Sequence, residues 1–226
     1  MARPEFEADE VQTFLRQCET CDAVLDIGAN VGFYSCLAAS RGRRVLTFEP
    51  APRNLNFLYR NLWSNGFSAV EVFPMGLGAK PGLMPIYGFG GITSFVPGWA
   101  QASKNSSHFA PVATLDFLVG GKLIGQKLLI KMDVEGFELA VLSGAQEMLN
   151  RKPKPTWMVE ILLNDPAVPC GVSPKFRQVF EMFWSNGYRS FALGSKVAEV
   201  LPGHVDDWVA CGQVDHDLHN FLFISE

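Results

Sequence analysis

Residues 23–32 read AVLDIGANVG, and this stretch decides the fold of the chain. Its first five positions are apolar except for one aspartate, and a glycine follows, which is the pattern of a short buried strand. A helical pattern over residues 32–40 and a second strand-like run over residues 43–49 come next. The order of strand, glycine loop, helix and strand predicts a βαβ unit within a parallel sheet.

Helical and strand-like patterns continue to alternate along the chain. Further helices are expected at 52–64, 138–149 and 173–184, and further strands at 69–73, 127–133, 156–161, 190–193 and 220–224. We therefore predict an α/β fold with a doubly wound, mostly parallel sheet and helices on both of its faces.

The chain is expected to fold as one domain over residues 1–226, a length that suits a single α/β unit. Apolar residues at helical spacing make residues 1–21 a helical N-terminal flank. Residues 79–111 are rich in glycine and proline, and we expect an irregular insertion on the substrate side. Within it, residues 85–108 are expected to form a mobile loop that orders over the site.

Composition excludes several classes of protein. The net charge is −4 and no basic run is present, which argues against nucleic acid as a partner. No apolar stretch approaches the ~20 residues of a membrane span, and no secretion signal is evident, so a cytoplasmic location is expected. Five cysteines in a chain of this size predict free thiols, and the C-x-x-C at 18–21 lacks the partners of a zinc site.

The glycine loop predicts a nucleoside site at the carboxyl edge of the sheet. Gly28 and Gly32 let the backbone approach a ligand, while Asn30 stands where a dinucleotide-binding loop needs glycine for its pyrophosphate. Asp26 would repel a pyrophosphate and suits a positively charged amino-acid group. Glu49 ends the second strand, about twenty residues beyond the loop, where an acidic side chain accepts hydrogen bonds from ribose.

A second motif, LLIKMDVEGFE at residues 128–138, places three carboxylates at the end of a buried strand. A carboxylate beside the nucleoside site orients or deprotonates a hydroxyl nucleophile, or helps to hold a divalent cation. Asp133 and Glu135 are the candidates, because Glu138 is explained by the N-terminus of the next helix. Glu160 ends the neighbouring strand and is a third candidate.

These motifs, together with FEP at 48–50, TLD at 114–116 and NFLF at 220–223, closely resemble the FkbM family of methyltransferases over roughly residues 22 to 224. The resemblance implies a seven-stranded Rossmann-like class I methyltransferase fold whose last strand is inserted antiparallel. It also implies S-adenosylmethionine as methyl donor and a hydroxyl of a sugar or natural product as acceptor.

The expected catalytic residues are therefore Asp133, Glu135 and Glu160. The expected donor-binding residues are Asp26, Gly28, Asn30, Gly32, Phe33, Glu49, Pro50, Asn54 and Gly76. No residue is assigned to a metal, although a divalent cation stays open as a cofactor.

Two other functions use the same scaffold, because fold alone does not separate them. One is an NAD(P)-dependent oxidoreductase, which Asn30 and Asp26 disfavour. The other is a protein that binds S-adenosylmethionine without turnover. The sequence leaves the identity of the acceptor, the dependence on metal and the oligomeric state open.

Overall fold

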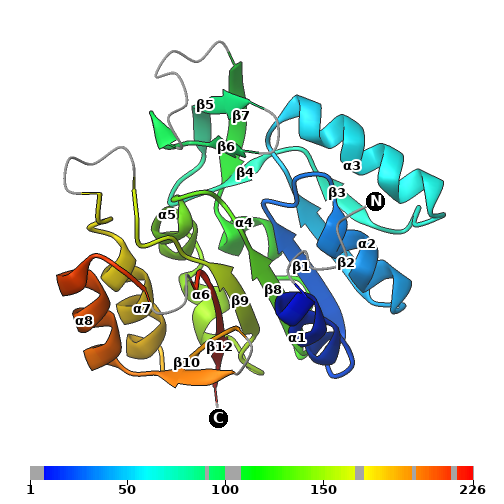
Figure 1. The fold of residues 1–226 in the computed structure, drawn as a ribbon. Coiled ribbons are helices and arrows are strands. Elements are labelled where there is room, and N and C mark those ends of the chain that lie inside the picture. The colour runs from blue at the N-terminus through cyan, green and yellow to red at the C-terminus, as the bar shows by residue number, and fades with distance from the viewer. Residues whose placement is uncertain are drawn as a thin grey trace.

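The computed structural model describes residues 8–89, 92–99, 108–165, 171–194, 197–214 and 218–225. Within them, eight strands form a central sheet in the order β11-β10-β12-β9-β8-β1-β2-β3 (Figure 1). The strands of this sheet are β1 (Ala23–Ile27), β2 (Arg44–Phe48), β3 (Glu71–Phe73), β8 (Leu128–Met132), β9 (Thr156–Glu160), β10 (Arg189–Ala192), β11 (Ala198–Val200) and β12 (Asn220–Ile224).

The pairing of these strands confirms the predicted parallel sheet. Strand β1 is parallel to both β2 and β8, and β8 is parallel to β9. Strand β12 runs antiparallel between β9 and β10, as the resemblance implied. The described sheet has eight strands rather than seven, because the short edge strand β11 pairs antiparallel with β10. Its three residues are too few to show a periodic pattern in the sequence.

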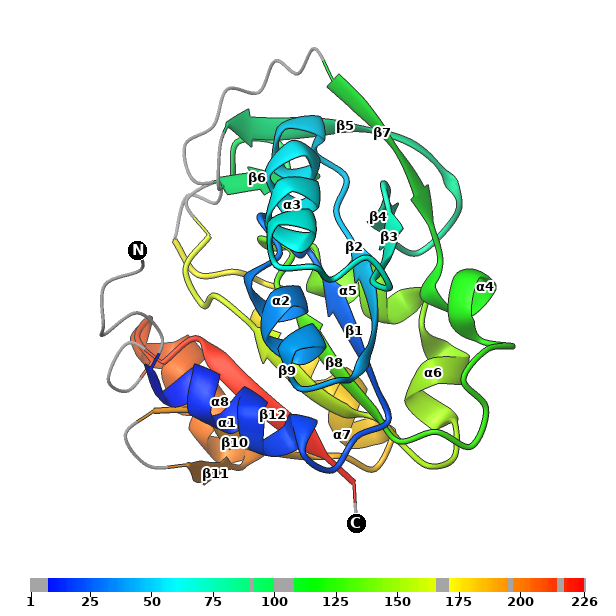
Figure 2. The same ribbon diagram turned by 90° about the vertical axis from the view of Figure 1, so that its right-hand side faces the viewer.

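Helices cover both faces of the central sheet (Figures 1 and 2). One face carries α1 (Ala8–Cys18), α2 (Phe33–Ser40) and α3 (Pro52–Ser64). The other carries α4 (Leu115–Val119), α5 (Glu138–Ser143), α6 (Gln146–Asn150), α7 (Phe176–Ser185) and α8 (Pro202–Cys211). The single helix expected at 138–149 is divided into α5 and α6 at Gly144, whose backbone lies so close to Gly78 that a Cβ would be 2.2 Å from its carbonyl oxygen.

The segment expected to be irregular, residues 79–111, instead contributes strands to a second sheet. In the parts of the chain that the structure describes, this sheet has the order β4-β7-β5-β6. Its strands are β4 (Gly76–Leu77), β5 (Gly82–Phe89), β6 (Ile92–Ser94) and β7 (His108–Ala113). Pro85 and Pro111 lie inside the antiparallel β5–β7 pair, and such prolines weaken the strand signal of a sequence. Figures 1 and 2 show this small sheet beyond the end of the central sheet at which β1 and β8 terminate.

No helix in the described residues is long and apolar enough to cross a membrane.

Candidate active site

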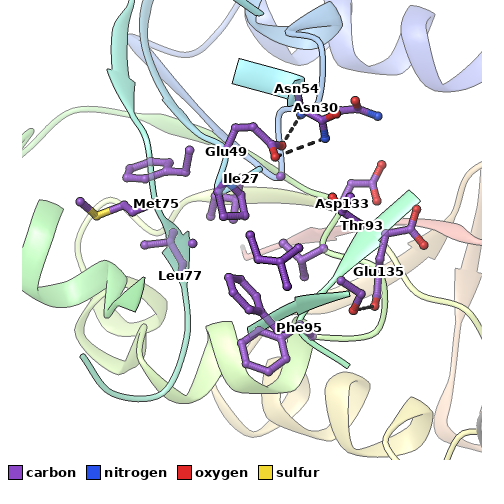
Figure 3. Close-up of a pocket in the computed structure, with 18 residues that line it drawn as sticks. Ile27, Asn30, Glu49, Asn54, Met75, Leu77, Thr93, Phe95, Asp133 and Glu135 are labelled. Carbon is purple, nitrogen blue, oxygen red and sulfur yellow. Dashed lines mark hydrogen bonds between the residues drawn. The ribbon is translucent and has the colours of Figure 1, made fainter. Parts of the chain in front are cut away.

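A pocket lies between the carboxyl ends of the central strands and the small sheet (Figure 3). Segments of both sheets line it: Ile27, Gly28, Asn30, Phe48, Glu49, Pro50, Asn54, Met75, Gly76, Leu77, Ile86, Thr93, Ser94, Phe95, Asp133, Val134, Glu135 and Phe137. Figure 3 shows Asp133 and Glu135 on the opposite side from Met75 and Leu77, with Glu49, Asn30 and Asn54 grouped at one end. The pocket therefore has an apolar wall and a carboxylate wall.

The glycine loop contacts the segment that carries the candidate base. Gly28 has a positive φ of 79°, and a Cβ built on it would lie 1.8 Å from the carbonyl oxygen of Asp133. The amide of Asp133 donates to the carbonyl of Ile27 at 2.9 Å. Glycine at position 28 thus lets two predicted motifs touch through their backbones.

Glu49 is held by three donors within the described part of the chain. Its Oε2 accepts from the Asn30 amide at 2.8 Å, and its Oε1 accepts from the Ala51 amide at 2.8 Å and from Asn54 Nδ2 at 3.3 Å (Figure 3). Burial raises the pKa of Glu49 to about 7, although these hydrogen bonds act in the opposite direction. A carboxylate oxygen can accept two hydrogen bonds, so Oε2, which accepts from the Asn30 amide, can accept a further one.

Asp26 lies behind the pocket and does not line it. Its side chain is buried on the α2 face of the sheet, where Ser35 Oγ donates to Oδ2 at 2.5 Å. Burial raises the pKa of Asp26 to about 6. Gly32 and Phe33 also lie outside the pocket wall. Gly32 lies against the Leu58 side chain. Phe33 is the first residue of α2, and its side chain is partly exposed.

Glu135 is held by β6 and by the segment that follows it. Trp99 Nε1 donates to Glu135 Oε2 at 2.7 Å, and Ser94 Oγ donates to the Glu135 carbonyl at 2.6 Å. Glu135 has a left-handed φ of 53°, and the Trp99 ring lies so close to Gly136 that a Cβ would be 2.4 Å away. Burial raises the pKa of Glu135. Hydrogen bonds from residues about forty positions earlier in the chain therefore hold the turn after β8 in place.

Asp133 and Glu160 lie at the ends of the neighbouring strands β8 and β9, and the Asp133 charge acts on the Glu160 carboxyl group. Burial and the neighbouring Asp133 charge raise the pKa of Glu160 to about 9. Glu160 does not line the pocket itself and reaches it through Asp133.

Glu138 is accounted for by local structure, as expected. Its Oε1 accepts from the Gly136 amide at 2.8 Å at the start of α5, and its side chain is buried. Burial raises the pKa of Glu138 to about 7.

Several pocket residues were not among the predicted site residues. Met75, Thr93, Phe95 and Phe137 line the wall, and the Phe95 ring covers Gly76 so closely that a Cβ there would be 2.4 Å from it. Thr93 and Phe95 belong to the segment 79–111 that was expected to be irregular, whereas Met75 and Phe137 lie outside it. Of the expected lid at 85–108, residues 90–91 and 100–107 lie outside the described residues.

No group of three or more histidine, cysteine, aspartate or glutamate side chains within the described residues is arranged to hold a metal ion.

Comparisons with known proteins identify the family. The family model described as "Methyltransferase FkbM domain" matches residues 26–190. A hexuronic acid methyltransferase, AglP, from Haloferax volcanii is 28% identical over 149 residues, which cover 63% of this chain and 58% of AglP. This match thus spans little more than half of the relative's length.

Solved structures show the same fold. The FkbM methyltransferase of Methylobacillus flagellatus superimposes with a TM-score of 0.58 at 18% identity, covering 91% of this chain and 44% of that chain. An O-methyltransferase from Bacillus cereus, solved in complex with SAH, has a TM-score of 0.55 at 13% identity, with 98% and 80% of the two chains covered. The fold is the class I methyltransferase fold, and the chain belongs to the FkbM family of methyltransferases.

Proposed function

We propose that this protein is an S-adenosylmethionine-dependent O-methyltransferase that acts on a hydroxyl group of a small molecule or saccharide. The observation that carries the proposal is one pocket that is lined both by a ribose-type acidic residue, Glu49, and by the carboxyl groups of Asp133 and Glu135. Family membership favours this function over a nicotinamide-dependent oxidoreductase.

The residues at one end of the pocket fit a nucleoside. Glu49 lines the pocket and its Oε2 can accept a further hydrogen bond, while Ile27, Phe48, Met75 and Leu77 provide apolar surface for a base. Asn30 and Asn54 hold the Glu49 carboxylate in place from two directions. When bound, S-adenosylmethionine supplies an electrophilic methyl group. The chain's own contribution here is to bind and orient.

The carboxylates on the other wall fit a hydroxyl acceptor. A neutral hydroxyl is a weak nucleophile, so its oxygen gains from a group that accepts its proton as the new carbon–oxygen bond forms. Asp133 lines the pocket, so its carboxyl group is within reach of an acceptor hydroxyl bound there. Glu135, fixed by Trp99, is placed to orient a second hydroxyl of a polyol.

A saccharide acceptor is supported by the AglP match and by the aromatic side chains near the carboxylates. Aromatic faces such as Phe95 pack against the apolar faces of sugar rings. The acceptor panel should therefore include neutral sugars, uronic acids and polyketide or lipid alcohols.

The test is methyl transfer from labelled donor to this panel. We expect release of S-adenosylhomocysteine with at least one hydroxyl acceptor, which a purely binding protein would not give. Asp133→Asn should lower turnover by ~100-fold or more while donor affinity stays within a few-fold. The control is Asp207→Asn, an exposed acid on α8, which should leave turnover unchanged. Full turnover in the Asp133→Asn variant would refute the base assignment and pass the role to Glu135 or Glu160.

A binding comparison separates the donor from a dinucleotide. Calorimetry should detect S-adenosylhomocysteine and S-adenosylmethionine but not NAD, because Asn30 occupies the position at which a pyrophosphate needs glycine. Binding of NAD with equal affinity would overturn the donor assignment.

A further inference from the structure

Lys131 is a buried cation in the centre of the main sheet. The residue is 2% exposed and lies on β8, between β1 and β9. Its Nζ is 3.4 Å from Asn220 Oδ1 and 5.2 Å from the centroid of the Tyr34 ring. An amide oxygen and a ring face compensate an ammonium only in part, so the surrounding carboxylates must supply the rest.

Acidic groups lie near Lys131 on two neighbouring strands, β1 and β9, and in the turn after β8. Asp26 is its register partner on β1, and the others converge at the carboxyl ends of β8 and β9. The charge of Lys131 lowers the pKa of Asp26, Glu135 and Glu160, against the burial that raises them. The groups that face Lys131 are Asp26 from β1, Tyr34 from α2, Asp133 and Glu135 from the end of β8, Glu160 from β9 and Asn220 from β12.

Lys131 does not line the pocket, so it cannot contact either substrate directly. The side chain points to the α2 face of the sheet, behind the carboxylates. An apolar residue of similar length would fill this space without the cost of burying a charge. We therefore attribute the ammonium group at this position to its interaction with the nearby carboxylates.

We propose that Lys131 is a positioning residue that acts as the shared buried counter-ion of the acidic side chains beside it and so favours their ionised forms. The inference rests on the proposed methyltransferase function for its consequence, but not for its electrostatic content. Without this cation, the carboxyl groups of Asp26, Glu135 and Glu160 would hold their protons to higher pH.

The test compares Lys131→Met, which keeps length and removes charge, with Lys131→Arg, which keeps charge. The pH profile of turnover should show its acid limb moved upward by about one pH unit or more in Lys131→Met, with about a tenfold loss below the midpoint and recovery at higher pH. Lys131→Arg should keep the midpoint of the parent. The matched control is Lys127→Met, at an exposed lysine four residues earlier, which should leave the midpoint of the pH profile unchanged.

A purely structural role would lower thermal stability and turnover at every pH without moving the midpoint. That result, or a midpoint equally displaced in Lys131→Arg, would overturn the proposal. If Lys131→Met does not fold, Lys131→Gln provides the neutral variant, since its amide retains a hydrogen bond to Asn220.

A second readout needs no substrate. Infrared difference titration counts protonated carboxyl groups, and Lys131→Met should retain them to higher pH than the parent protein does. An unchanged titration overturns the counter-ion role. If the titration shifts while no acceptor is ever methylated, the proposed function fails and the counter-ion inference stands.

Discussion

Replacement of Gly28 by alanine tests the contact between the glycine loop and the candidate base. The new Cβ would lie 1.8 Å from the Asp133 carbonyl oxygen, where ordinary contact begins at 3.4 Å, so the two segments must separate by about 1.6 Å. Alanine at a φ of 79° adds about 1–2 kcal/mol, and the forced displacement of a packed segment adds about 1–3 kcal/mol. We expect Gly28→Ala to destabilise the protein by about 2–5 kcal/mol.

Gly42→Ala is the matched control for this substitution. Gly42 has a similar φ of 69°, but a Cβ there would meet nothing within 4 Å. Gly42→Ala should therefore destabilise the protein by only about 1–2 kcal/mol, the conformational cost of alanine at a positive φ. Denaturant unfolding measures the stability of both variants, and calorimetry with S-adenosylhomocysteine measures their donor affinity.

The glycine loop carries the Asn30 amide that holds Glu49, so donor affinity should fall at least ~10-fold in Gly28→Ala and stay unchanged in Gly42→Ala. Equal destabilisation of the two variants would show that the close approach at Gly28 is not a constraint. Unaltered donor affinity in Gly28→Ala would remove the loop from the donor site.

Glu49→Ala should weaken S-adenosylhomocysteine binding by about 1–3 kcal/mol in calorimetry, because it removes charge-assisted hydrogen bonds to ribose. Burial raises the pKa of Glu138 to about 7 from 4.5, so the folded state holds a proton that the unfolded chain releases in this window. Stability should therefore fall as the pH rises from about 5 to about 8, and Glu138→Gln should flatten that slope in denaturant unfolding. Trp99→Phe keeps a ring and removes the donor to Glu135, so turnover should fall about tenfold at unchanged donor affinity. Residues 85–108 should exchange amide hydrogens faster than strand β8 without ligands and become protected when donor and acceptor bind.

Each of these predictions has a clear contrary result. Unchanged affinity in Glu49→Ala would exclude the ribose contact, and an unaltered pH slope in Glu138→Gln would assign the slope to other carboxyls. Wild-type turnover in Trp99→Phe would show that Glu135 needs no orienting partner. Protection of residues 85–108 equal to that of β8 in the absence of ligands would exclude a lid.

The sequence alone determined the βαβ start, the parallel sheet and the position of the site at its carboxyl edge. These features depend on local pattern: short apolar runs, helical spacing, and glycines where the backbone needs a positive φ. Gly28, Asn30, Glu49 and Asp133 occupy their expected pocket because they follow directly from strand ends.

Only the tertiary structure decided where the acidic side chains point. Asp26 turns away from the pocket to Ser35, and Glu135 is held by Trp99 from 36 residues earlier in the chain. Lys131 donates a hydrogen bond to Asn220, which lies 89 residues later in the chain. The small sheet was not predicted, because its prolines and glycines weaken the strand pattern of the sequence. Contacts between distant segments leave no periodic trace in a sequence, because they depend on which strands become neighbours and which face each side chain takes.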